Sequence, residues 1–152
     1  MAFTLEYSTV AKCKPEHIWN FFSNLEQWAW WNRVVGPCRW LNGQPWQKGS
    51  RFHLELDKPR RMRVECTILE CAPPAKVGWV GGGLGWKGEH WFTFEAQPDG
   101  TTLMKQWENL SGFATVLASD RMKKQAMAAY EAWFEALKFE AERMAREEKA
   151  KS

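Results

Sequence analysis

One segment decides the fold: residues 113–152, FATVLASDRMKKQAMAAYEAWFEALKFEAERMAREEKAKS, which contain neither glycine nor proline. Apolar residues recur in it every three or four positions, as one face of an α-helix requires; they are Ala126, Tyr130, Phe134, Leu137, Ala141 and Met144. Even a helix limited to Ala114 to Glu147 would span about 50 Å. We therefore expect a long amphipathic C-terminal helix that lies along the concave side of a sheet.

The residues before this segment are broken by turn residues at strand-length intervals. Residues 51–57, 62–71 and 89–95 alternate apolar and polar side chains, which is typical of half-buried strands. Pro98-Asp99-Gly100 predicts the turn of a hairpin whose second strand covers residues 101–111. Further strands are expected at 3–12, around Trp40-Leu41 and at 76–80, with short helical segments from Pro15 and over 25–31.

The size and composition fit one globular domain. The chain has 152 residues, and we expect the domain to cover 1–147 and the charged tail 148–152 to fray. Eleven tryptophans and nine phenylalanines suit a large aromatic core or an aromatic-lined pocket. A net charge of +3 does not mark a nucleic-acid binder. Without a secretion signal or a membrane span, we expect a cytoplasmic protein, no membrane insertion and four reduced cysteines.

Three apparent motifs have simpler interpretations. Gly83, Gly85 and Gly88 match G-x-G-x-x-G, but a strand follows where a dinucleotide site needs a helix, so we expect a flexible loop between two strands, near a cavity mouth. Cys66 and Cys71 point to opposite faces of one strand and cannot chelate a metal together, so no metal site and no cofactor are predicted. The basic cluster 58–63 could contact an acidic partner or lipid head groups, but a solvated hairpin turn is the simpler interpretation.

The most specific polar group combines His90, Glu108 and Gln106. Because strand residues alternate, Phe92 and Phe94 put His90 on their own face, and the second face of 101–111 carries Gln106 and Glu108. If His90 and Glu108 pair across the hairpin, the carboxylate would fix the imidazole tautomer and raise the pKa of His90. Such a pair could transfer protons, orient a ligand, or only satisfy its own hydrogen bonds.

The order of these elements resembles the START-like (SRPBCC) superfamily, also called Bet v 1-like or polyketide cyclase-like. The resemblance covers nearly the whole chain, and it is carried by residues 14–19 (KPEHIW), Trp28, Trp31, 49–52 (GSRF), 69–74 (LECAPP), 90–92 (HWF), 99–101 (DGT), Glu108 and Gly112. It implies an α+β helix-grip, in which a curved antiparallel β-sheet of six to seven strands wraps around the long C-terminal α-helix, with two short helices after the first strand. It also implies a hydrophobic cavity between sheet and helix, but no catalytic residue set.

We expect this cavity to be lined by His90, Gln106, Glu108, Trp79, Phe52, Phe92, Phe94, Tyr130 and Phe134, with Trp28 or Trp31 near its entrance. Three functions stay open. The first is binding of a hydrophobic, aromatic or lipid-like molecule. The second is a cyclase or aromatase that uses His90 and Glu108 as acid and base. The third is a protein-interaction module similar to chaperone-activating members of the superfamily, with a protein as partner. The oligomeric state is left open.

Overall fold

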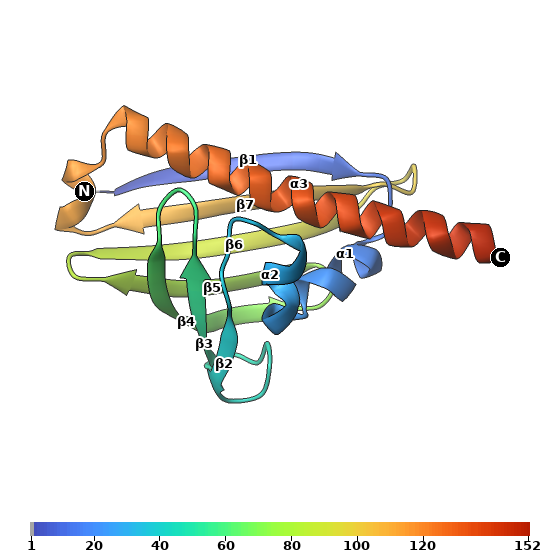
Figure 1. Cartoon of the computed structure of the whole chain (residues 1–152), viewed down its shortest axis with the longest axis horizontal. Helices are drawn as coiled ribbons and strands as arrows, with labels where there is room; N and C mark the ends of the chain where they lie inside the picture. The colour runs from blue at the N-terminus through green and yellow to red at the C-terminus, as the bar shows by residue number, and fades with distance from the viewer. Residues whose placement is uncertain (1) are drawn as a thin grey trace.

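The computed structural model describes residues 2–152, and it consists of one curved antiparallel sheet with a long helix across it (Figure 1). The sheet has seven strands in the spatial order β1-β7-β6-β5-β4-β3-β2. Their bounds are β1 Ala2–Ala11, β2 Arg39–Asn42, β3 Arg51–Leu56, β4 Met62–Ala72, β5 Lys76–Gly83, β6 Trp86–Ala96 and β7 Thr102–Ser111. The expected helix-grip is confirmed.

Two short helices and a 3-10 turn fill the connection between β1 and β2. They are α1 (Pro15–Phe22), η1 (Leu25–Gln27) and α2 (Trp28–Trp31). The fixed φ of Pro15 suits the first position of α1, where no intrahelical hydrogen bond is required of its nitrogen. The indole of Trp28 donates to the carbonyl of Phe22 at 2.9 Å, which holds α2 against the end of α1. The two short helices predicted after the first strand are therefore present.

The long helix α3 (Asp120–Lys151) begins later than the sequence suggested. Residues Phe113–Leu117 form a separate 3-10 segment, η2, and the Ser119 side chain accepts a hydrogen bond from the backbone of Met122 at 3.2 Å. This N-cap, and not a glycine or proline, fixes the start of the helix. The long helix therefore starts six residues after Ala114, the first residue used for the length estimate from the sequence. At the other end α3 continues through residues 148–151, for which the sequence predicted fraying.

The C-terminal half of α3 is anchored on β1 and α1. Glu142 accepts the backbone N–H of Lys12 at 2.7 Å, and Glu135 accepts the hydroxyl of Tyr7 at 2.8 Å. Glu148 pairs with the imidazole of His17 at 2.7 Å. Leu137, in the same half of the helix, is fully buried. The C-terminal half of α3 therefore packs against β1 and α1, whereas the N-terminal half covers the rest of the sheet.

The hairpin β6–β7 turns as predicted, with Gly100 at a φ of +87°. Its register puts His90 directly opposite Glu108, and Phe92 directly opposite Gln106. Side chains of directly opposite residues lie on the same face of a sheet. Three of these four are polar, and all four face α3. The alternation therefore gathers polar groups at one place in an otherwise apolar face.

The glycine-rich segment is part of the sheet. Gly81, Gly82 and Gly83 belong to β5, where they pair with Gly88, Lys87 and Trp86 of β6, so only Leu84 and Gly85 form the turn. The prediction of a loop over Gly83–Gly88 was wrong, because glycine's low strand propensity was outweighed by the pairing of β5 with β6, which continues to Gly83 and Trp86.

Candidate functional site

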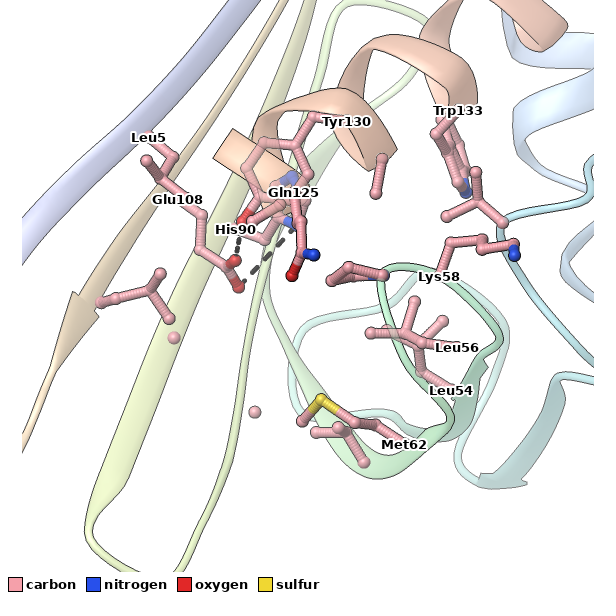
Figure 2. A pocket seen from close by; sticks show the side chains of 18 of the residues that line it. Leu5, Leu54, Leu56, Lys58, Met62, His90, Glu108, Gln125, Tyr130 and Trp133 are labelled. Atoms are coloured by element: carbon pink, nitrogen blue, oxygen red, sulfur yellow. Dashed lines mark hydrogen bonds and ion pairs between the residues drawn. The ribbon is translucent and has the colours of Figure 1, made fainter. Parts of the chain in front are cut away.

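A cavity of about 430 Å³ lies between the sheet and the N-terminal half of α3 (Figure 2). Its wall takes apolar side chains from β1, β3 to β7, α2 and α3; among them are Leu5, Leu54, Leu56, Met62, Val64, Trp79, Phe92, Leu110, Ala126, Ala129 and Trp133. A volume of roughly 300–1,000 Å³ with few polar groups is typical of small-molecule sites in proteins.

The predicted aromatic residues divide between the cavity wall and the core. Trp28, Trp79, Phe92 and Tyr130 lie on the wall. The others pack in the core: Phe52, Phe94 and Phe134 are at most 1% exposed, and Trp31 packs edge-on against Phe21 and near Trp133. The expectation that Phe52, Phe94 and Phe134 line the cavity was wrong, because neighbouring rings cover them; Phe52 alone contacts Trp28, Trp40, Trp46 and Trp79. Of the alternatives Trp28 and Trp31, the structure places Trp28 on the wall.

Two glycines make room for the cavity. Gly81 of β5 and Gly88 of β6 pair across the strands, and both lie on the wall. A methyl group on Gly81 would stand 2.7 Å from Cγ1 of Val64, and one on Gly88 would stand 2.6 Å from Oε2 of Glu108. Side chains at these two positions would occupy the space that the cavity needs.

A chain of hydrogen bonds fixes the polar cluster on the wall. The side-chain N–H₂ of Gln106 donates to the backbone carbonyl of Tyr130 at 2.9 Å, so the amide oxygen of Gln106 points the other way. That oxygen lies 3.0 Å from Nε2 of His90, which must therefore carry the proton and donate. In a neutral His90 the other ring nitrogen, Nδ1, is then an acceptor. Gln106, and not Glu108, determines the tautomer.

Burial keeps the imidazole of His90 neutral. Loss of water lowers the pKa of His90 from its usual value of 6.5, and this effect exceeds the opposing influences of Glu108 and Gln106. Nδ1 of His90 and Oε2 of Glu108 are 3.9 Å apart, which is too far for a hydrogen bond. The carboxylate of Glu108 does act to raise the pKa of His90, as expected, but the loss of water caused by the enclosing rings of Trp79, Phe92 and Tyr130 outweighs it.

Glu108 takes its hydrogen bond from the helix. The hydroxyl of Tyr130 donates to Oε1 of Glu108, as the dashed line in Figure 2 shows. Burial, and then the neighbouring carboxylate, raises the pKa of Tyr130, so its hydroxyl stays protonated. Oε2 of Glu108 and Nδ1 of His90 are left facing each other as acceptors. A ligand N–H or O–H that enters this gap would find two hydrogen-bond acceptors.

Several wall residues were not predicted as site residues. Trp133 extends the apolar spacing of α3, four residues from both Ala129 and Leu137, so helical periodicity could have found it. Lys58, Pro59 and Arg60 form the β3–β4 turn and also line the cavity, together with Lys123 of α3. The turn itself was predicted, but the sequence carries no signal that it meets α3. Within residues 2–152, no group of three or more His, Cys, Asp and Glu side chains could hold a metal ion.

The comparisons with known proteins agree with this architecture. A family model described as polyketide cyclase / dehydrase and lipid transport matches residues 2–146. No curated protein matches the sequence. Within the described chain, none of the helices combines the length and the apolarity needed to cross a lipid bilayer.

Solved structures show the same fold at low sequence identity. An aromatase/cyclase, ZhuI, from a Streptomyces species has a TM-score of 0.79 and 10% identity, with 94% of this chain and 95% of that chain covered. A START superfamily protein from Mycobacterium smegmatis has a TM-score of 0.76 and 17% identity, with coverage of 93% and 98%. The protein Ara h 8.0201 has a TM-score of 0.75 and 12% identity, also with coverage of 93% and 98%.

The family model spans nearly the whole chain, and the sheet and the long helix have the fold of the structural neighbours. The resemblance found in the sequence is therefore confirmed: the chain belongs to the polyketide cyclase / dehydrase and lipid transport family of the START-like superfamily.

Proposed function

We propose that this protein binds a hydrophobic small molecule, aromatic or lipid-like, in the cavity between the sheet and α3. The observation that carries the proposal is an open volume of about 430 Å³ with apolar walls and a single internal polar cluster. Burial of an apolar ligand surface against these walls supplies the affinity, at roughly 25 cal/mol per Å² before the costs of binding. The family description, which includes lipid transport, is consistent with this role.

The polar cluster gives the bound molecule an orientation. Nδ1 of His90 and Oε2 of Glu108 accept hydrogen bonds, while Gln106 and Tyr130 are already engaged with partners of their own. A ligand hydroxyl or amine is therefore favoured at this end of the cavity, and an apolar group there would leave two acceptors without donors. We expect ligands with a donor group at one end of an apolar body.

The first test is native mass spectrometry of the purified protein, followed by extraction and identification of any bound compound. Titration with the neutral fluorescent dye 1-aminoanthracene supplies a defined probe. Ala126 lies on the cavity wall, so Ala126→Trp places an indole in the cavity; Ala132 is exposed on the same helix, so Ala132→Trp is the matched control.

We expect the dye to bind the parent protein and the Ala132→Trp variant alike, and to bind the Ala126→Trp variant at least about tenfold more weakly, because one ring displaces another. Circular dichroism checks that both variants keep the fold. Equal dye affinity in the two variants, or no co-purified compound together with no dye binding, would refute a ligand-binding cavity.

A second candidate is a cyclase- or aromatase-like enzyme, and one observation favours it. A neutral His90 whose Nε2 proton is held by Gln106 presents Nδ1 as a base next to a carboxylate. Such a base can remove a proton next to a ligand carbonyl, as enolisation and dehydration require. Glu108→Gln separates the two functions: a carrier should keep binding with modest weakening, whereas turnover in an enzyme should fall by on the order of a hundredfold or more.

The protein-interaction alternative has less support. A cavity packed shut by side chains would favour a role carried by the surface alone, but here the space between sheet and α3 is open. A protein partner could still bind elsewhere, and pull-down with the Ala126→Trp variant would test it: an interaction that survives filling of the cavity does not depend on the cavity.

A further inference from the structure

The mouth of the cavity carries positive charge. Lys58 and Arg60 reach it from the β3–β4 turn, and Lys123 reaches it from the first turns of α3 (Figure 2 labels Lys58). The turn and α3 are far apart in sequence, and together they contribute three cations to the lining of one cavity. Glu108, at the inner polar cluster, is the only acidic residue on the described wall.

These three cations differ from their neighbours in having no acidic partner. Arg61 lies 4.0 Å from Asp57, and Arg63 lies 3.9 Å from Glu55, so two charges of the basic cluster are already paired. In residues 2–152, Lys58 and Arg60 form no ion pair, and the ammonium of Lys123 lies 4.4 Å from the centre of the Phe3 ring. The unpaired cations of the cluster are the ones that line the cavity.

The charges at the two ends of the cavity have opposite signs. A ligand anion placed beside Glu108 would be repelled by the carboxylate, and the hydroxyl of Tyr130 could not donate to it because that hydroxyl already donates to Glu108. The same anion at the mouth would meet three cations beside an apolar wall, where water screens charges less than in bulk solvent. An elongated ligand with one anionic end can therefore bind in one orientation only.

We infer that the ligand is an anionic amphiphile, with its apolar body in the cavity and a carboxylate or phosphate at the mouth between Lys58, Arg60 and Lys123. This inference rests on the proposed function and specifies the class of molecule bound. Each cation at the mouth is exposed or half-exposed, so its effect is modest, about two- to fivefold in affinity per ion pair, and about tenfold or more for the three together.

The test is displacement of 1-aminoanthracene by four probes that share one alkyl chain: decanoate, decyl phosphate, 1-decanol and decyltrimethylammonium. Inorganic phosphate is added alone, to separate a free anion from an anionic head group. The test variant is Lys58→Gln/Arg60→Gln. Its matched control, Arg61→Gln/Arg63→Gln, removes the same charge from the end of this turn and the start of β4, from side chains that pair with Asp57 and Glu55.

We expect decanoate or decyl phosphate to displace the dye about tenfold better than 1-decanol at low salt, and decyltrimethylammonium to be the weakest. The comparison of the two head groups identifies the anion. The anionic preference should shrink several-fold in the test variant and persist in the control, while displacement by 1-decanol stays the same in both. Inorganic phosphate should displace nothing.

Equal displacement by decanoate, decyl phosphate and 1-decanol in the parent protein would overturn the inference and leave the proposed function standing. An equal loss of preference in the test variant and the control would also overturn it, since net charge alone would then explain the effect. Failure of the dye to bind, together with the absence of any co-purified compound, would instead refute the proposed function, and this inference with it.

Discussion

Gly81 and Gly88 are cross-strand partners in β5 and β6, and both face the cavity. Two glycines opposite each other weaken a sheet, since neither contributes a side chain to the pairing. Here the missing side chains leave open the space between Val64 and Glu108. The glycine pair therefore makes the sheet less stable but leaves the cavity larger. Gly81 borders the apolar side chain of Val64, whereas Gly88 borders the carboxylate of Glu108.

Gly88→Ala should reduce recognition of a ligand hydroxyl. The new methyl group would lie 2.6 Å from Oε2 of Glu108, so the carboxylate must turn away from the position in which Tyr130 holds it. We expect 1-naphthol to bind the parent protein more tightly than naphthalene by about tenfold, and the difference to vanish in the variant. Isothermal titration with both compounds measures this.

Gly81→Ala is the matched control for that measurement. Its methyl group would meet Cγ1 of Val64 and not the carboxylate, so it narrows the apolar wall. Both compounds should then bind more weakly by a similar factor, and the advantage of 1-naphthol should remain. If Gly88→Ala also kept that advantage, the polar cluster would not be what recognises the hydroxyl.

Tyr130→Phe should destabilise the protein more than the same change at Tyr7. Both hydroxyls donate to a glutamate, Tyr130 to Glu108 inside the cavity and Tyr7 to Glu135 between β1 and α3. Removing a donor from a desolvated carboxylate costs about 1–3 kcal/mol, whereas the outer carboxylate of Glu135 can turn to water. Urea unfolding of the two variants compares these costs directly.

Equal destabilisation of the two tyrosine variants would mean that Glu108 is as well hydrated as Glu135. Glu108→Gln supplies a further check, because a glutamine oxygen can still accept the hydroxyl of Tyr130. Its effect on the free energy of unfolding should be smaller than that of Tyr130→Phe.

Periodicity in the sequence was sufficient for the fold and for part of the site. The alternation of 89–95 and the turn at Pro98-Asp99-Gly100 put His90 opposite Glu108 on one face, and the register agrees. Their role in binding stays a prediction. The sequence did not reveal Gly81 and Gly88 as wall residues, because glycine in a run resembles a loop until both neighbouring strands are known.

Properties that depend on burial could not be predicted from the pattern. The pKa of His90 falls because aromatic rings enclose it. The sequence around His90 does not show which aromatic side chains from other elements will surround it. Phe52, Phe94 and Phe134 have the spacing of wall residues, yet other aromatic side chains cover them. Lys58 and Arg60 belong to the site only because the β3–β4 turn and α3 line the same cavity.

Stability should depend on the protonation of His90 below about pH 6.5. The pKa of His90 is lowered in the folded protein, so the unfolded chain takes up the proton first as the pH falls. The contribution of the neutral His90 to the free energy of unfolding is therefore fully present above pH 6.5. It is lost as the pH falls toward the folded-state pKa, by at most about 1.4 kcal/mol per pH unit.

His90→Gln removes this titration and keeps a donor for Gln106. Urea unfolding of both proteins at a series of values from about pH 8 to about pH 5 isolates the effect, because the other histidines contribute equally to each. As the pH falls, the parent protein should lose more free energy of unfolding than the His90→Gln variant, so the variant becomes more stable relative to the parent. A difference that is constant with pH would mean that His90 titrates normally in the folded protein.

Gly78→Ala should destabilise the sheet through contact with Trp91. Gly78 pairs with Trp91 across β5 and β6, and a methyl group at Gly78 would lie 2.1 Å from the indole ring. The ring cannot move aside freely, since Trp107 stacks on one side of it and the ammonium of Lys76 lies 5.0 Å from its centre. We expect a cost of about 1–3 kcal/mol, as for other overpacked sites.

A double-mutant cycle with Trp91→Ala separates this contact from any general effect of alanine in β5. In the Trp91→Ala background the methyl group has room, so Gly78→Ala should cost much less or become favourable, because alanine is less flexible than glycine in the unfolded chain. Thermal unfolding of the four proteins gives the coupling energy. If the effects of Gly78→Ala and Trp91→Ala on stability were additive, the cost of Gly78→Ala would arise from the backbone of β5 and not from contact with the indole.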